Sequence, residues 1–77
     1  NPFNPITSIS YHLNQPSKVE ISVHDLTGRK MATIEHKFYE AGYHTIDWNA
    51  SEFSSGKYFI NLTVDDITLT KPITLLK

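Results

Sequence analysis

Four histidines are the side chains of this sequence best suited to chemistry, since an imidazole binds metal ions and transfers protons near neutral pH. They are His12, His24, His36 and His44. Zinc ligands usually occur as close pairs of histidine or cysteine, whereas these histidines are dispersed and the chain has no cysteine. We therefore expect strand-surface histidines, with His12 and His24 facing outward and His44 at the margin of the core. No metal ion and no other cofactor is expected.

Carboxylates and hydroxyls are also present in the types that a catalytic triad needs. Asp25, Glu35 and Asp47 could each be combined on paper with a serine and a histidine. The sequence contains neither the strand-turn-helix elbow nor the glycine-rich oxyanion loop that would support such a triad. A domain this small also leaves little room for a cleft. The sequence thus predicts that the domain is not an enzyme.

Exposed aromatic rings are the feature that a sugar-binding sandwich would use for stacking. The candidates are Tyr39, Tyr43, Trp48, Tyr58 and Phe59. The parity of the strands places Trp48 with Ile46 and Tyr58 with Ile60, which favours a core role for both. Phe59 lies on the opposite face from Tyr58. Carbohydrate binding therefore stays an alternative function for the domain, and Asp65-Asp66 is interpreted as a solvated turn in preference to a calcium site.

The length and charge of the chain exclude several classes of partner. Its 77 residues form one domain, whose folding buries about 60% of the surface of the unfolded chain. Seven basic residues are scattered among eight acidic ones, and the net charge of −1 argues against nucleic-acid binding. No apolar run approaches the roughly 20 residues that span a bilayer. The absence of cysteine excludes disulfides.

The stretch 19–34 predicts a β-hairpin around which the remaining chain is organised. Val19, Ile21 and Val23 alternate with polar residues, and this period of two puts them on one dry face of a strand. Asp25-Leu26-Thr27-Gly28 then predicts a tight turn. The returning strand carries Met31 and Ile34, and their odd spacing indicates a bulge or an early end to pairing.

Other segments repeat this alternation and predict further strands. The residues that share a face are Ile9, Tyr11 and Leu13; His44, Ile46 and Trp48; Tyr58, Ile60, Leu62 and Val64; and Ile67, Leu69, Ile73 and Leu75. Lys71 interrupts the last of these faces and Pro72 cannot donate to a ladder, which favours an edge strand or a bent one. Short strands without any helical period predict an all-β fold, a small antiparallel β-sandwich of six or seven strands.

With these segments in place, the chain resembles the type A C-terminal sorting domain of the type IX secretion system of Bacteroidota. The residues that carry the resemblance are Asn1-Pro2-Phe3-Asn4-Pro5, Ile9-Ser10-Tyr11-x-Leu13, Val19-x-Ile21-x-Val23-x-Asp25-Leu26-x-Gly28-Arg29, Ala41-Gly42-Tyr43-His44-x-Ile46-x-Trp48-Asn49-Ala50, Ser55-Gly56-x-Tyr58-Phe59 and Thr70-Lys71-x-Ile73-x-Leu75-Leu76-Lys77. Each block alone is weak, but their order along the chain is specific. The resemblance implies an immunoglobulin-like sandwich.

The resemblance also implies a function and a set of partners. Such a domain directs a cargo protein, fused at its N-terminal side, through the outer-membrane translocon, and a sortase-like peptidase usually removes it. The expected route runs from the periplasm to the cell surface or the medium. Residues 1–77 are then a single sorting domain cut from a larger precursor, with 1–5 as a lead-in and 6–77 as the sandwich.

Carried over by position, the recognition elements lie in a turn and in the last strand. They are Gly56, Tyr58, Lys71, Ile73, Leu75, Leu76 and Lys77. A translocon component would add a strand to the final edge. The same edge allows homodimerisation through the final hairpin. The alternative from a different class is a non-catalytic accessory or spacer module of a secreted enzyme, with carbohydrate as its ligand.

Overall fold

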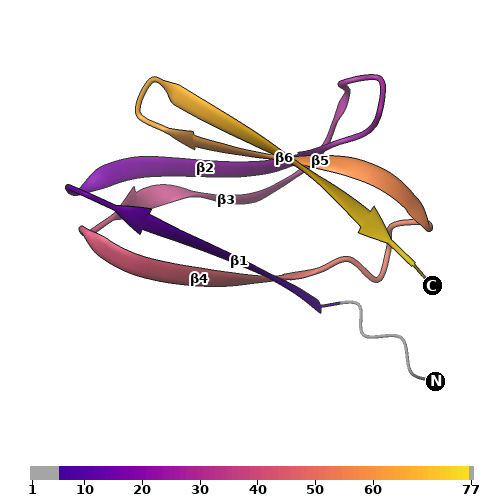
Figure 1. Cartoon of the computed structure of the whole chain (residues 1–77), viewed down its shortest axis with the longest axis horizontal. Helices are drawn as coiled ribbons and strands as arrows, with labels where there is room; N and C mark the ends of the chain where they lie inside the picture. Colours follow the sequence, from indigo (N-terminus) through magenta and orange to yellow (C-terminus); the bar gives the residue numbers. More distant parts are fainter. Residues whose placement is uncertain (1–5, 77) are drawn as a thin grey trace.

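Residues 6–76 of the chain are described by a computed structural model, which consists of six antiparallel strands in two sheets (Figure 1). The strands are β1 (Ile6–Leu13), β2 (Ser17–His24), β3 (Lys30–Tyr39), β4 (Gly42–Asn49), β5 (Gly56–Val64) and β6 (Ile67–Leu75). One sheet has two strands in the order β1-β4, and the other has four in the order β3-β2-β5-β6. The all-β antiparallel sandwich is confirmed. The predicted lead-in over residues 1–5 lies outside the described residues.

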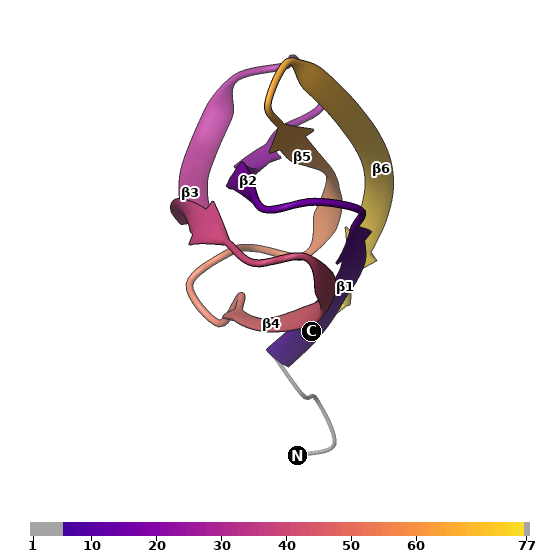
Figure 2. The same cartoon turned by 90° about the vertical axis from the view of Figure 1, so that its left-hand side faces the viewer.

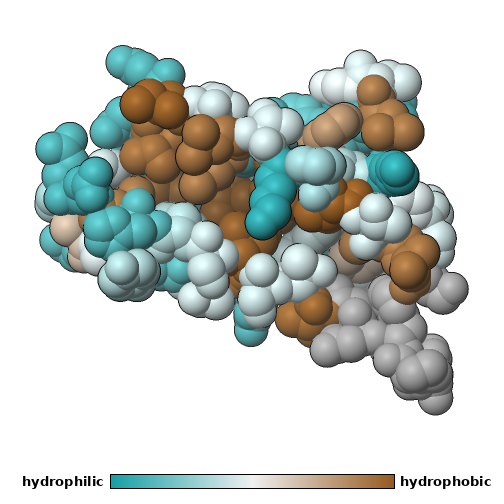
Figure 3. Space-filling model, viewed as in Figure 1, coloured by the Kyte–Doolittle hydropathy of each residue, from teal (hydrophilic) through white to brown (hydrophobic). Residues whose placement is uncertain are grey.

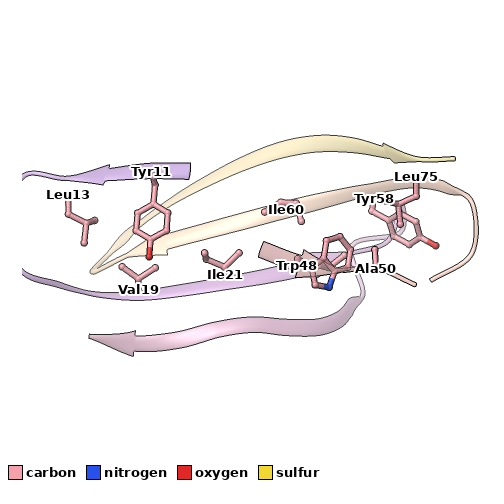
Figure 4. Packing of buried hydrophobic residues seen from close by; sticks show 10 residues of the cluster. Tyr11, Leu13, Val19, Ile21, Trp48, Ala50, Tyr58, Ile60 and Leu75 are labelled. Atoms are coloured by element: carbon pink, nitrogen blue, oxygen red, sulfur yellow. The ribbon is translucent and has the colours of Figure 1, made fainter. Parts of the chain in front are cut away.

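The core lies between the two sheets, with β2 at its centre. Val19, Ile21 and Val23 are completely buried, as their alternation predicts. Figure 4 shows Tyr11 and Leu13 reaching toward β2 from β1, and Tyr11 pointing toward Val19. The dry face of the first hairpin is therefore covered by the small sheet.

The other end of the core is built from aromatic rings. Trp48 is 7% exposed, and its ring meets the ring of Phe53 at a centroid distance of 5.1 Å. Phe53, which lies in the loop between β4 and β5, also packs against Tyr58 at 5.6 Å. Aromatic pairs at such distances and near-perpendicular angles contribute about 0.5–1.5 kcal/mol beyond their buried area. Phe53 thus closes the sandwich beneath this loop.

The predicted irregularity of the second hairpin strand is confirmed and falls on the residues that indicated it. In the pairing of β2 with β3, Ile21 faces Glu35 and Ser22 faces Thr33, so Ile34 is the extra residue. A second shift, between Val23 and His24, leaves Met31 as an extra residue. Each bulge adds one residue to β3 and resets which side chains face the core.

The strand β3 extends further than the apolar pattern indicates. Residues 35–39 are largely polar, yet they continue the ladder until Tyr39 pairs with Ser17. The start of β2 supplies backbone partners there whatever the side chains on β3 are, and main-chain pairing does not depend on side-chain polarity. Phe38 remains 60% exposed on the outer face.

Candidate recognition strand

The last strand, β6, forms one edge of the four-stranded sheet, which confirms the prediction made from Lys71 and Pro72. It pairs with β5 along its whole length, from Val64 opposite Ile67 to Gly56 opposite Leu75. Its other edge has no strand partner within residues 6–76. A free edge exposes main-chain N–H and C=O groups to any extended chain that approaches it.

This pairing brings together two predicted recognition elements that are separate in the sequence. Gly56 lies opposite Leu75, and Tyr58 lies opposite Ile73. Gly56 has a φ of 151°, a backbone conformation that favours glycine, so a larger residue would strain the start of β5. The turn before β5 and the end of β6 therefore form one continuous region.

Within this region, two of the predicted side chains are buried. Tyr58 is 8% exposed, and its hydroxyl donates a hydrogen bond of 2.8 Å to the Ser54 carbonyl. Leu75 is 6% exposed and belongs to the core cluster. Their side chains thus shape the edge from beneath and are not presented at the surface.

The remaining predicted residues differ in their exposure. Lys71 is exposed, Leu76 is 72% exposed, and Ile73 is half-buried against the core. Lys77 lies outside the described residues. Lys71 is the only charged residue of β6. The second half of this strand, together with the following Leu76, therefore combines a free backbone edge with one cation and one exposed large apolar side chain.

The start of β6 shows a feature that the sequence pattern did not reveal. Ile67 and Leu69 have the same parity as Leu75 and pair with Val64 and Leu62, yet they are 67% and 64% exposed. Their inner face is uncovered because the small sheet has two strands and the large one has four. The exposure of Ile67 and Leu69 could be inferred from this mismatch in strand number, but the mismatch is known only once the strands are assigned to sheets.

An open groove results from this mismatch. It has a volume of about 820 Å³ and is lined by the end of β1 and its following loop, and by the β5–β6 hairpin from Leu62 to Leu69. Figure 2, which looks along the sandwich, shows β1 and β6 next to each other on the same side of the molecule. We refer to this feature as the β1–β6 groove.

The histidines do not gather into a site. His44 packs against Tyr11 and Tyr39 at the core margin, as predicted, and His12 is exposed beside Tyr43. His24 is half-buried, with its ring nitrogens at 3.0 Å from the Ser22 hydroxyl and 3.2 Å from the Gly28 carbonyl oxygen. Within residues 6–76, no three side chains of metal-binding type cluster.

Within residues 6–76, the aromatic side chains are not assembled into one exposed platform. Trp48 and Tyr58 are buried in the core. Tyr43 is 87% exposed on the outer face of the two-stranded sheet, whereas Phe59 is half-buried on the opposite, outer face of the four-stranded sheet. Stacking of a sugar across several rings is therefore not supported by this arrangement.

The fold is a small β-sandwich, and its accessible features, the free edge of β6 and the β1–β6 groove, suit interaction with another chain. The model of the secretion system C-terminal sorting domain family matches residues 1–75, and this chain belongs to that family. The resemblance to the type IX sorting domain is thereby confirmed. Neither the comparison with curated proteins nor the comparison with solved structures found a match.

Family membership establishes the general role of the chain. It is a C-terminal sorting signal of the type IX kind, which implies interaction with the secretion machinery, a cargo domain, and export to the cell surface or medium. This family is non-catalytic. The described part of the chain has no helix with the length and hydropathy to cross a membrane.

Proposed function

We propose that the outer-membrane translocon recognises this domain through the free edge of β6 and the residue that follows it, Leu76, and thereby exports the attached cargo from the periplasm. The family match over residues 1–75 carries this proposal. The free edge gives it a physical basis, because an added strand gains main-chain hydrogen bonds and reads alternate side chains. A sortase-like peptidase then separates the domain from its cargo.

In this proposal, the buried side chains position the edge and the exposed side chains contact the translocon. Tyr58 and Leu75 hold the end of β6 in place from inside the core. Lys71 and Leu76 are exposed, and they offer a positive charge and an apolar side chain by which a partner can distinguish this edge from others. Recognition of a folded edge also explains why a β-domain serves as the signal, since the edge exists only when β5 and β6 are paired.

Secretion of a reporter tests the sorting role directly. The 77-residue chain and its native upstream linker are fused to a fluorescent protein that carries a periplasmic export signal, in a host with type IX secretion. We expect the reporter at the surface or in the medium, freed from the domain, only when the translocon is intact. Reporter held in the periplasm with the domain attached would overturn the proposal in favour of an accessory module.

Two exposed positions with matched exposure then test the recognition edge. Leu76→Asp places a charge beside the free edge at a side chain that is 72% exposed, and Leu26→Asp places the same charge on the β2–β3 turn at one that is 64% exposed. We expect the first variant to lose most secretion and the second to retain it. Equal secretion of the two folded variants would contradict recognition at this edge.

A further inference from the structure

The β1–β6 groove has the features of a site for an added strand, at the opposite end of β6 from Leu76. Ile67 and Leu69 form its apolar wall, and both face inward from the sheet without cover. Figure 3 shows apolar surface exposed on this side of the molecule, between β6 and β1. Single exposed apolar residues are ordinary, but a continuous patch that lines a groove marks an interaction site.

The strand β1 borders this groove with a free backbone edge. It pairs with β4 on one side, and within residues 6–76 no strand pairs with its other side. Its last residues, Ser10–Leu13, line the groove directly. A third strand added to β1 would lie over the uncovered inner face of the β5–β6 hairpin, and the small sheet would then cover more of the large one.

The charge of the groove indicates what such a strand carries. Asp65 and Asp66 are the only acidic or basic residues apart from His12 among those that line it, and both lie at the hairpin turn. Both are exposed, and neither has an ion-pair partner in the part of the chain that the structure describes. Asp65 is held in the turn by its N–H, which donates a bond of 3.2 Å to the Lys18 carbonyl. The end of the groove therefore favours a cation.

We infer that the β1–β6 groove binds an extended segment of a partner protein, which pairs antiparallel with β1, places alternate apolar side chains on Leu69 and its neighbours, and sets a basic residue against Asp65 and Asp66. The inference goes beyond the sorting function, because this groove is separate from the recognition edge near Leu76. Antiparallel pairing puts the N-terminal end of the added strand at the acidic turn, since β1 itself runs toward that turn. A basic residue at the start of the segment therefore meets the carboxylates.

A peptide of this chemistry tests the groove without any secretion assay. The probe is an acetylated peptide of about seven residues, the length of an ordinary strand, which begins with lysine and continues with alternating valine and threonine. Its twin begins with glutamate. Backbone amide shifts of the chain are followed by NMR during titration with each peptide. We expect shifts at Ser10–Leu13 and at the β5–β6 hairpin, and tighter binding of the lysine peptide.

Variants with matched exposure identify the contact. Leu69→Thr keeps a residue suited to a strand but removes apolar contact, and we expect it to weaken binding by about tenfold. Leu26→Thr changes an equally exposed leucine, 64% exposed like Leu69, on a turn away from the groove, and should change affinity by less than about twofold. Asp66→Lys should reverse the preference between the lysine and glutamate peptides.

Several results would overturn the inference. One is that the lysine peptide causes no backbone amide shifts, and another is that the shifts are confined to residues 71–76. A third is that Leu69→Thr and the wild type bind the lysine peptide with equal affinity. Concentration-dependent shifts in the groove without peptide would show that a second copy of the chain occupies it, which would overturn the choice of partner. Failure of the reporter to be secreted would affect the sorting proposal alone, because the peptide titration does not depend on export.

Discussion

The two halves of β6 have the same alternation and the same neighbour, β5, but different surroundings. At its end, Leu75 is 6% exposed and joins the core. At its start, Leu69 is 64% exposed on the same inner face. The covered half and the open half differ only in what lies across the sandwich. Alternation thus determines the face on which a side chain lies, and the width of the opposing sheet determines whether that face is buried.

This difference gives the two ends of one strand different physical properties. The covered half fixes the position of the edge through Leu75 and Tyr58, whereas the open half leaves apolar surface and a groove. Lys71 lies between the halves, on the inner face opposite Ile60. A single strand therefore combines an end with a buried inner face and an end whose inner face is accessible to another chain.

Truncation of one leucine in each half should give the largest contrast. Leu75→Ala removes buried side-chain volume and should lower the free energy of unfolding by about 2–5 kcal/mol. Leu69→Ala removes side chain that is mostly in water and should change it by less than about 0.5 kcal/mol. Urea denaturation followed by Trp48 fluorescence measures both. Similar losses would show that the open half is covered in solution.

Two tyrosine hydroxyls provide a finer contrast. The Tyr58 hydroxyl donates to the Ser54 carbonyl at 2.8 Å, so Tyr58→Phe should cost about 1 kcal/mol. The Tyr11 hydroxyl is buried without a hydrogen-bond partner in the described residues, and burial, followed by the charge of Glu35, raises the pKa of Tyr11. Tyr11→Phe should therefore be neutral or stabilising. Equal losses in thermal unfolding of the two variants would contradict the difference.

Much of this fold follows from local sequence, because a half-buried strand imposes a period of two on its side chains. The complete burial of Val19, Ile21 and Val23 confirms the prediction from their alternation. The bulges at Ile34 and Met31 are visible as a break in that period. Features that a strand or turn requires by itself are therefore predictable from the chain alone.

The groove could not be predicted in this way, because it depends on the assignment of strands to sheets. Nothing in the sequence indicates that β1 pairs only with β4 within residues 6–76, which leaves Ile67 and Leu69 uncovered. Tyr58 and Leu75 were predicted as recognition residues from the family resemblance, and burial gives both a structural role. The recognition role remains a prediction for all seven residues, Gly56, Tyr58, Lys71, Ile73, Leu75, Leu76 and Lys77, and the secretion variant Leu76→Asp tests it at Leu76.

Lys71 should act as the boundary between the halves of β6. An inward-pointing charge next to a free edge opposes edge-to-edge aggregation between copies of the same chain. Lys71→Leu would join the apolar surfaces of the two halves, so we expect aggregation at a lower protein concentration, with the unfolding free energy changed by less than about 1 kcal/mol. Light scattering measures the onset. The control is Lys57→Leu, an exposed position of opposite parity on β5, which should not change it.

The smallest expected effect concerns the turns at the two ends of the large sheet. In the β2–β3 turn, the Asp25 carboxylate accepts hydrogen bonds from the Thr27 hydroxyl at 2.6 Å and the Arg29 N–H at 3.0 Å. These bonds hold the pKa of Asp25 below its ordinary value of 3.8, and the bond from the Thr27 hydroxyl has the largest effect. The β5–β6 turn, at the open half, contains Asp66, whose side chain is exposed and outside any ion pair of the described residues.

The sign of the pH effect follows from the lowered pKa. Ionised Asp25 favours the folded state, so its contribution is complete above the ordinary pKa and is lost as the pH falls through the lower, folded value. Asp25→Asn should therefore lower the melting temperature slightly near neutral pH and reduce its decline in acid. Asp66→Asn should leave that decline unchanged. Calorimetry of both variants across the acidic range gives their melting temperatures as a function of pH. If the melting temperature of Asp25→Asn fell in acid just as that of the wild type does, the bonds to Asp25 would not stabilise the fold.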